Sequence, residues 1–202
     1  MKKTLKKASD AELLDRYDAG DENAFHMLVN RYKEELYAFL RRFLIRQDLV
    51  EDVFQETFLQ LFNSKDSYDR SRNLRPWLFT IAANKAKDAL RKQQRTAAKT
   101  LGTMPADEEM SIGDVLNVIT SVNTTPYDEV EKSETAAAVR KVISEMPENL
   151  QEILLLAYFN RFSYKQMSQV LSIPIGTVKS RLHMAVVHFA KKYKALKREQ
   201  SD

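Results

Sequence analysis

The sequence predicts an all-α protein made of two small helical domains joined by a flexible linker, with a helix-turn-helix in the second domain. Apolar residues recur at i, i+3, i+4 and i+7, and no segment alternates apolar and polar residues as a half-buried strand does. This spacing is lost between about residues 96 and 125 and then resumes. The 202 residues are 44% hydrophobic and 30% charged, a balance that permits a packed core in each half.

The predicted N-terminal domain comprises residues 1–95. Asp10 is expected to cap its first helix, which ends at Gly20, and Asp21 to start the second. Pro76 falls in the first turn of the fourth helix, where its missing N–H is harmless. The four helices are expected at about residues 10–19, 21–40, 48–62 and 76–95, with a polar loop at 63–75 before the last.

The predicted linker, residues 96–125, is rich in Ser, Thr and Asn and contains two of the four glycines. It also holds an acidic cluster, Asp107–Glu109. One short amphipathic turn is expected in it, near Val115–Ile119.

The second domain is expected at residues 126–202. Thr125 caps its first helix, and Pro147 separates that helix from the next. A three-residue turn, Ser172–Pro174, joins the last two helices. Helices are expected at about residues 126–146, 164–171 and 175–194, and a further one after Pro147 is expected to hold Leu150, Ile153, Leu154 and Ala157.

The composition excludes several classes of chemistry. There is no cysteine, which removes disulfide frameworks, thiolate metal sites and thiol nucleophiles. The four glycines are too far apart to form a phosphate-cradling loop or a dinucleotide-binding turn. The three histidines stand at no metal-ligand spacing with Asp or Glu. We therefore expect no cofactor, no metal and no catalytic residue.

The charge is unevenly distributed along the chain. The first 100 residues hold 20 Lys and Arg against 15 Asp and Glu; residues 101–135 hold one against eight, and residues 136–202 hold 11 against five. Two basic blocks thus flank an acidic strip, and basic blocks are what polyanion binding requires. The alternative is that these charges only solvate helix faces.

No stretch approaches the 18 apolar residues that a membrane-spanning helix requires, and the basic start lacks the apolar core of a secretory signal. We expect a cytoplasmic protein with no membrane insertion.

The segment FSYKQMSQVLSIPIGTVKSRLHMAV has the order of a helix-turn-helix: Ser163 before a short helix, a three-residue turn, then a longer helix. In such a motif the second helix lies in the major groove and presents its first residues to the bases. The alternative is a helical hairpin that only packs. The expected DNA contacts are Thr177, Lys179, Ser180, Arg181 and His183.

The string SYKQMSQVLSIPIGTVKSRLH resembles the minus-35-reading domain of the extracytoplasmic-function class of bacterial sigma factors. DLVEDVFQETFLQLF (Asp48–Phe62) resembles the family segment that docks on the β′ clamp helices of RNA polymerase. RPWLFTIAANKAKDALRKQQR (Arg75–Arg95) resembles the segment that reads and opens the minus-10 element. The resemblance implies an alternative sigma factor, which binds core polymerase, directs it to specific promoters and has no chemistry of its own.

The helix at about residues 48–62 carries one acidic face, which favours a protein partner because phosphates would repel it. The alternative is a merely solvated face. The resemblance implies that this face docks on polymerase. The expected contacts are Asp48, Glu51, Asp52, Gln55 and Glu56.

For the minus-10 segment, the resemblance implies that Ile81 and Asn84 help form a pocket for a base flipped from the melted strand, and that the loop 67–75 selects the base. Single-strand binding needs cations and stacking platforms. Trp77 has two interpretations, a wedge at the duplex fork or a core residue. The expected contacts in this region are Tyr68, Arg72, Ile81, Asn84, Lys85 and Arg91.

The partners implied are core RNA polymerase (β′ clamp helices and β flap) and promoter DNA, with an anti-sigma factor as a further candidate. If the two promoter elements lie two to three duplex turns apart, the gap is roughly 70–100 Å. A relaxed linker spans about 30 Å and an extended one roughly 100 Å. The linker must therefore be extended when both domains bind.

Two alternatives remain open from the sequence. A free-standing regulator could use the same helix-turn-helix, but it would not need the acidic docking helix. A hydrolase with a hidden triad is the other.

The chain departs from the family in two places that bear on DNA binding. Ser172 stands where a glycine is frequent, which can strain a left-handed position. Met184–Val187 replace arginines that usually follow SRLH, which removes phosphate contacts.

Overall fold

The computed structural model describes residues 8–44, 46–96, 119 and 134–199. All regular structure in these residues is helical, which confirms the predicted fold class. The N-terminal group, here called the N-module, comprises α2 (Asp10–Asp18), α3 (Glu22–Phe43), α4 (Gln47–Ser64), a 3₁₀ turn (Lys65–Ser67) and α5 (Leu74–Thr96). The C-terminal group, the C-module, comprises α8 (Glu134–Ser144), α9 (Glu148–Leu154), a π-helical turn (Leu155–Phe159), α10 (Tyr164–Leu171) and α11 (Ile175–Glu199).

The N-cap of the first helix lies one residue earlier than predicted. Ser9, not Asp10, is its N-cap: the Ser9 hydroxyl accepts from Glu12 N at 3.2 Å and Glu12 Oε2 accepts from Ser9 N at 2.7 Å, a complete capping box. Asp10 instead binds Arg31 and the Tyr32 hydroxyl on α3, tying α2 to its neighbour. Gly20, at φ +94°, ends the turn after α2, as a residue without Cβ can.

The N-module core is aromatic. Phe39 and Phe79 are fully buried and pack edge to face, with their ring centroids 5.3 Å apart. Trp77 is partly buried and packs against this core, the second of the two sequence interpretations.

In the C-module, α10 has the predicted bounds and a second capping box. The Ser163 hydroxyl accepts from Gln166 N, and the Gln166 side chain accepts from Ser163 N at 2.9 Å. Pro147 precedes α9, as predicted. The π-helical turn after α9 was not predicted. The Thr125 cap and the acidic cluster lie outside the described residues, and of the predicted linker only Thr96 and the buried Ile119 are described.

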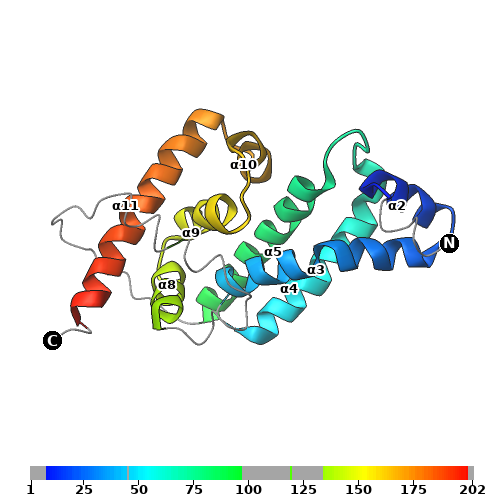
Figure 1. Ribbon diagram of the computed structural model, residues 1–202. Helices are drawn as coiled ribbons and strands as arrows, with labels where there is room; N and C mark the ends of the chain where they lie inside the picture. The colour runs from blue at the N-terminus through cyan, green and yellow to red at the C-terminus, as the bar shows by residue number, and fades with distance from the viewer. Residues whose placement is uncertain (1–7, 45, 97–118, 120–133, 200–202) are drawn as a thin grey trace.

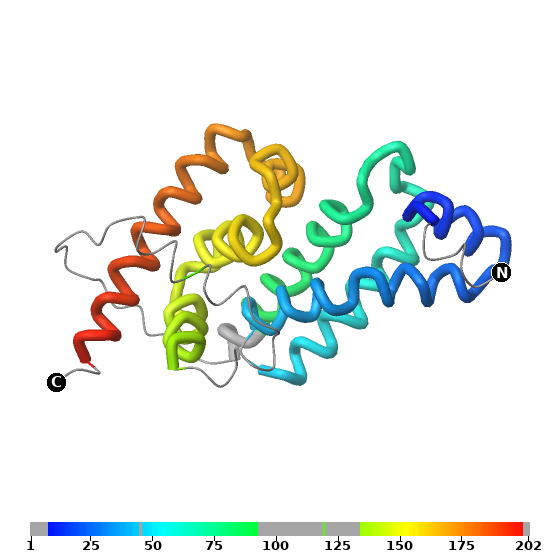
Figure 2. The backbone as a smooth tube through the Cα atoms, in the orientation of Figure 1, coloured from blue at the N-terminus to red at the C-terminus, as the bar shows by residue number. Residues whose placement is uncertain are grey.

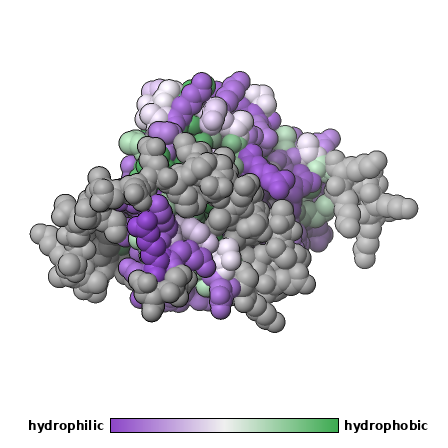
Figure 3. Space-filling view, turned by 60° about the vertical axis from the view of Figure 1, so that its left-hand side comes forward, coloured by the Kyte–Doolittle hydropathy of each residue, from purple (hydrophilic) through white to green (hydrophobic). Residues whose placement is uncertain are grey.

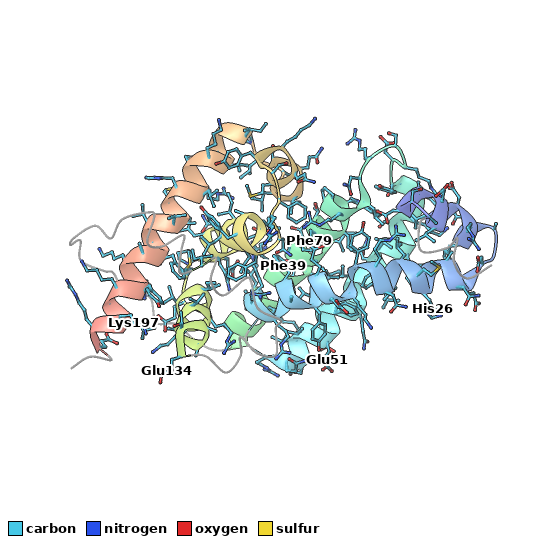
Figure 4. All side chains as sticks on the ribbon, viewed as in Figure 1. His26, Phe39, Glu51, Phe79, Glu134 and Lys197 are labelled. Carbon is cyan, nitrogen blue, oxygen red and sulfur yellow. The ribbon has the colours of Figure 1, made fainter. Side chains whose placement is uncertain are left out.

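The two modules lie directly against one another (Figures 1 and 2). In Figure 1, α9 and α10 of the C-module face α3 and α5 of the N-module. The Phe79 ring contacts Phe162, just before α10, with centroids 5.1 Å apart, and Figure 4 shows Phe39 and Phe79 at the centre of the molecule, where the modules meet. None of the helices in the described part of the chain is long and apolar enough to cross a membrane.

Candidate nucleic-acid and protein-docking surfaces

The outward face of α4 carries the predicted acidic residues. Asp52 and Gln55 are exposed and form no hydrogen bond or ion pair with the described residues. Glu51 accepts from the Gln47 side chain at 3.2 Å and points away from the bundle in Figure 4. Arg46 bonds Asp48 and lowers the pKa of that carboxyl below its usual value. The centre of this face is therefore available to a partner.

Leu59 is an additional member of this face. Its side chain is 61% exposed, although it is a large aliphatic residue. It lies four residues after Gln55 and seven after Asp52, so the three side chains share one side of the helix. Sequence reasoning missed Leu59; the signal was a leucine outside the apolar stripe of its own helix.

The loop before α5 is held by internal bonds. The Tyr68 ring is buried and stacks on Trp77, with centroids 4.8 Å apart, and its hydroxyl donates to the Arg72 carbonyl. Burial raises the pKa of Tyr68 to about 12. Asp69 accepts from Ser71 N and from Arg72 Nε, both at 3.0 Å. Tyr68 is therefore not open as a stacking platform for a base, and it instead orders the loop.

The cations around this loop are already paired. Arg70 bonds Asp15 and Asp18, and Lys65 also bonds Asp18. Lys65 first and Arg70 second lower the pKa of the Asp18 carboxyl by hydrogen bonding. Any phosphate that approaches these cations must compete with carboxylates of α2.

On α5, Asn84 is exposed and has no hydrogen-bond partner among the described residues, while Ile81 is partly buried one turn earlier. Lys85 forms an ion pair with Glu56 of α4, Nζ to Oε2 at 3.1 Å. Arg91 lies 3.5 Å from Asp88 on its own helix. The structure thus joins a residue predicted to contact DNA, Lys85, to one predicted to contact polymerase, Glu56.

On α11, Lys179, Ser180 and His183 are exposed at the start of the helix, and Thr177 is half-buried. The Lys179 ammonium lies 5.8 Å from the centre of the Tyr164 ring on α10 and forms no ion pair with a described carboxylate. On the one face drawn in Figure 3, the coloured residues are mostly hydrophilic, with smaller hydrophobic patches among them. This helix start is an accessible cationic surface.

Arg181 is half-buried rather than fully exposed. Its charge acts on Glu152 of α9, a carboxyl only 3% exposed. Burial raises the pKa of Glu152, while Lys87 and then Arg181 oppose that rise. Arg181 therefore lies close enough to α9 to act on the Glu152 carboxyl by its charge.

The Ser172–Pro174 turn positions α11. Ser172 adopts φ 53° and ψ 42°, the left-handed conformation expected at this position. The Ser168 hydroxyl donates to the Ile173 carbonyl at 2.5 Å and so connects the turn to α10. No group of three or more potential ligands that could hold a metal ion occurs among the described residues.

Comparisons with known proteins agree with this geometry. The family model described as Sigma-70 region 2 matches residues 28–96, and the model described as Sigma-70, region 4 matches residues 136–189. The chain is 31% identical over 181 residues to the ECF RNA polymerase sigma-E factor of Haemophilus influenzae, covering 88% of this chain and 91% of that protein. It is 30% identical over 167 residues to the ECF RNA polymerase sigma factor SigW of Bacillus subtilis, covering 81% and 86%.

Solved structures share the fold. CnrH in complex with the cytosolic domain of CnrY superposes with a TM-score of 0.64 at 23% identity, covering 95% of this chain and 99% of that chain. The sigma factor RpoE in complex with the anti-sigma factor NepR from Bartonella quintana gives 0.60 at 21% identity, covering 84% and 96%. Together, the two sigma regions in order and the related ECF factors show that this chain belongs to the extracytoplasmic-function class of sigma factors, which direct RNA polymerase to promoters.

Proposed function

We propose that the two modules divide the work of a sigma factor as follows. The N-module, within residues 1–95, docks on the β′ clamp helices through α4 and holds melted minus-10 DNA with α5 and the loop before it. The C-module, within residues 126–202, reads minus-35 duplex DNA with α11 and contacts the β flap. The chain supplies recognition and positioning only, so catalysis belongs to the polymerase, and it acts in the cytoplasm, where polymerase and promoters are.

One observation supports this division: among the described residues, the exposed charged side chains without a partner are acidic on α4 and basic at the start of α11. Asp52 and Gln55, with Leu59 beside them, form an acidic and partly apolar face that suits a basic protein helix. Lys179, by contrast, is an exposed cation with no carboxylate partner in the described chain. Phosphates attract the second surface and repel the first.

In the N-module, Asn84 is the side chain best suited to contact an extruded base. It is exposed and its amide is unpaired in the described chain, with Ile81 as an apolar neighbour. An amide can hydrogen-bond the edge of a flipped base, and such bonds offset an unstacking cost of a few kcal/mol. Tyr68 and Arg72 act on this site through the ordered loop, and Lys85 and Arg91 supply cations beside it.

An anti-sigma factor is a further proposed partner. Both solved neighbours were determined as complexes, RpoE with the anti-sigma factor NepR and CnrH with CnrY. The proposal for this chain rests on that shared fold.

Binding to core polymerase separates this proposal from the free-standing regulator. Dye-labelled full-length chain is titrated with core RNA polymerase, and a primary sigma factor is then added as competitor. We expect saturable binding that the competitor displaces. A chain that binds duplex DNA yet shows no displaceable binding to core polymerase would be a regulator, and the proposal would be wrong.

A further inference from the structure

The outer part of the loop before α5, residues 69–73, has a single side chain that bonds to a distant segment of the described chain. Tyr68, just before it, is buried and stacks on Trp77. The other side-chain bonds of residues 69–73 reach only close neighbours in the sequence. Arg70 is the exception, because its partners lie 55 and 52 residues earlier, on α2.

Arg70 bridges two carboxylates. Its Nη1 donates to Asp15 and its Nη2 to Asp18, and these two acids stand three residues apart, on one side of α2. A guanidinium is planar and rigid, so two bonds to different carboxylates fix its rotation as well as its position. In Figure 1, the segment that connects α4 to α5 lies beside α2. Arg70 therefore ties the outer loop to α2 in one orientation.

Asp18 also holds the base of the loop. The Lys65 ammonium, on the 3₁₀ turn, donates to the Asp18 carboxylate and lies 5.9 Å from the ring centres of Tyr17 and Phe62. Two bonds from different cations converge on this one carboxylate, which is why its pKa is lowered, by Lys65 first and Arg70 second. A single acid of α2 thus connects the base and the outer part of the loop.

The helix that carries these acids is itself fixed to the N-module. Leu13 and Leu14 of α2 are buried in the core. Asp10, at the start of α2, bonds Arg31 and the Tyr32 hydroxyl of α3. The two carboxylates near the end of α2 therefore have set positions relative to the helical bundle, and the loop takes its shape from them.

A need for stability does not explain this arrangement. The Asp15 side chain is 65% exposed, and ion pairs in contact with water add little to the free energy of unfolding. What the bonds do fix is the place of the residues beside Arg70, since Ser71 and Arg72 follow it directly and are exposed. Recognition of one base needs contact groups that are held in place by the residues behind them.

We propose that Asp15 and Asp18 are positioning residues for base selection. Through Arg70 and Lys65 they hold the loop before α5 in the shape that accepts the preferred extruded base. The selectivity for the minus-10 strand is thus set in part by residues of α2 that do not contact the base. This proposal rests on the proposed function of the loop and α5.

The variants act on this arrangement from both sides. Asp15→Ala with Asp18→Ala removes both carboxylates of α2, whereas Arg70→Lys keeps the charge of the loop but lacks the planar fork that bridges them. Glu22→Ala with Glu34→Ala is the matched control for net charge, since both are exposed glutamates of α3 with no partner among the described residues. Circular dichroism shows whether each variant is folded, and a folding defect in one leaves the other as a test.

The readout is the base preference of holoenzyme formed from core polymerase and each full-length chain. The holoenzyme binds a DNA fork whose single-stranded minus-10 segment is randomised, and the bound and input strands are sequenced. In the parent, the preferred base at the position read by the loop should be enriched about tenfold or more, the usual cost of one wrong base. The α2 variant and the Arg70→Lys variant should each reduce that enrichment to about twofold, and the control should match the parent.

The possible results separate this inference from the proposed function. If the parent selects a base and either variant selects it equally well, the inference is overturned and the proposed function stands. Tighter binding of every sequence by the α2 variant, with unchanged preference, would also overturn it, because the carboxylates would then only compete with phosphates for Arg70. A parent without base preference at any position would refute the proposed role of the loop, and this inference with it.

A second measurement uses the free chain without DNA. Amide hydrogen exchange in residues 65–73 should be at least about threefold faster in both variants than in the parent, because the loop opens more often. The control should exchange at the parent's rate. Equal rates in all four chains would show that α2 does not order the loop and would overturn the inference.

Discussion

The cations that we expect to contact DNA are paired differently in the two modules. In the N-module, Arg70 and Lys85 are each paired with a carboxylate of the same module. In the C-module, Lys179 forms no ion pair with a described residue, whereas Arg181 forms none but acts by its charge on the buried Glu152 carboxyl. A paired cation must exchange one anion for another when DNA arrives, so we expect selectivity in the N-module to depend on bases and on loop shape. An unpaired cation such as Lys179 gains fully from a phosphate, so we expect the C-module to contribute more of the affinity.

The largest expected effect comes from reversing a charge on the acidic face of α4. Asp52→Arg places a cation on the α4 face and should weaken core polymerase binding at least about 100-fold, because like charges brought together cost several kcal/mol. Asp66→Arg is the control, since that side chain is 86% exposed on the turn after α4 and lies outside the docking face. Titration of core polymerase measures both. Equal loss in the two variants would assign the effect to net charge and not to this face.

Arg181→Ala tests the cationic surface at the start of α11. We expect promoter binding by the holoenzyme to weaken by about 1–3 kcal/mol, with relaxed selectivity at one minus-35 position. Competition between duplexes that differ at single positions measures it. Uniform weakening on every duplex would mean that Arg181 contacts phosphate and does not read a base.

Salt dependence compares the modules directly. Lys179→Ala should reduce the slope of log K against log salt concentration by about 0.9 for one lost phosphate contact. Lys85→Ala should reduce it less, because Lys85 is already neutralised by Glu56. Equal reductions would show that ion pairing in the N-module does not matter for DNA binding.

Ser172→Gly tests the strain in the helix-turn-helix turn. Glycine adopts φ 53° without a Cβ penalty, so the free energy of unfolding should rise by roughly 1 kcal/mol. The change Ser180→Gly, at an exposed position inside α11, should instead lower it by roughly 0.5 kcal/mol. Urea denaturation measures both. A lower free energy of unfolding in the Ser172→Gly variant would contradict the backbone strain assigned to Ser172.

The smallest expected effect is a difference in pH response. Burial first, then Lys192 and Lys191, lower the pKa of His188 below its ordinary value of 6.5. The unfolded chain then binds more protons between the two pKa values, so stability from this group is present above pH 6.5 and is lost as the pH falls through the folded pKa. In the N-module, the pKa of Asp18 is lowered from 3.8 mainly by Lys65. Asp18 therefore also makes its module less stable as the pH falls, but only in more acidic solution than His188 does.

Hydrogen exchange followed by mass spectrometry between pH 7 and pH 5 should show weakening of the C-module before the N-module. His188→Gln should flatten that response. If the C-module still weakens before the N-module, to the same extent, in the His188→Gln variant, this assignment is contradicted.

Local signals predicted much of the fold. The bounds of α10 follow from Ser163 and Gln166 three residues apart and from the turn that starts at Ser172, all within ten residues. The first N-cap was wrong by one residue because Ser9 and Asp10 are both good caps. Glu12, three residues after Ser9, decides between them through the capping box.

The parts that sequence reasoning missed are contacts between distant residues. Nothing periodic indicates that Tyr68 stacks on Trp77 or that Gln151 donates to the carbonyls at the end of α3. The prediction of two domains on a flexible linker contained no contact between them, because helical periodicity identifies an apolar face but not its partner. Leu59 was missed for a related reason, since it departs from its own apolar stripe.

Selection from a randomised promoter library by core polymerase plus this chain tests the central claim most directly. The account predicts transcripts from templates enriched in two sequence blocks, with a fixed separation of about two to three duplex turns. Enrichment of one block alone, or transcription from no template while the free chain still binds duplex DNA, would contradict it.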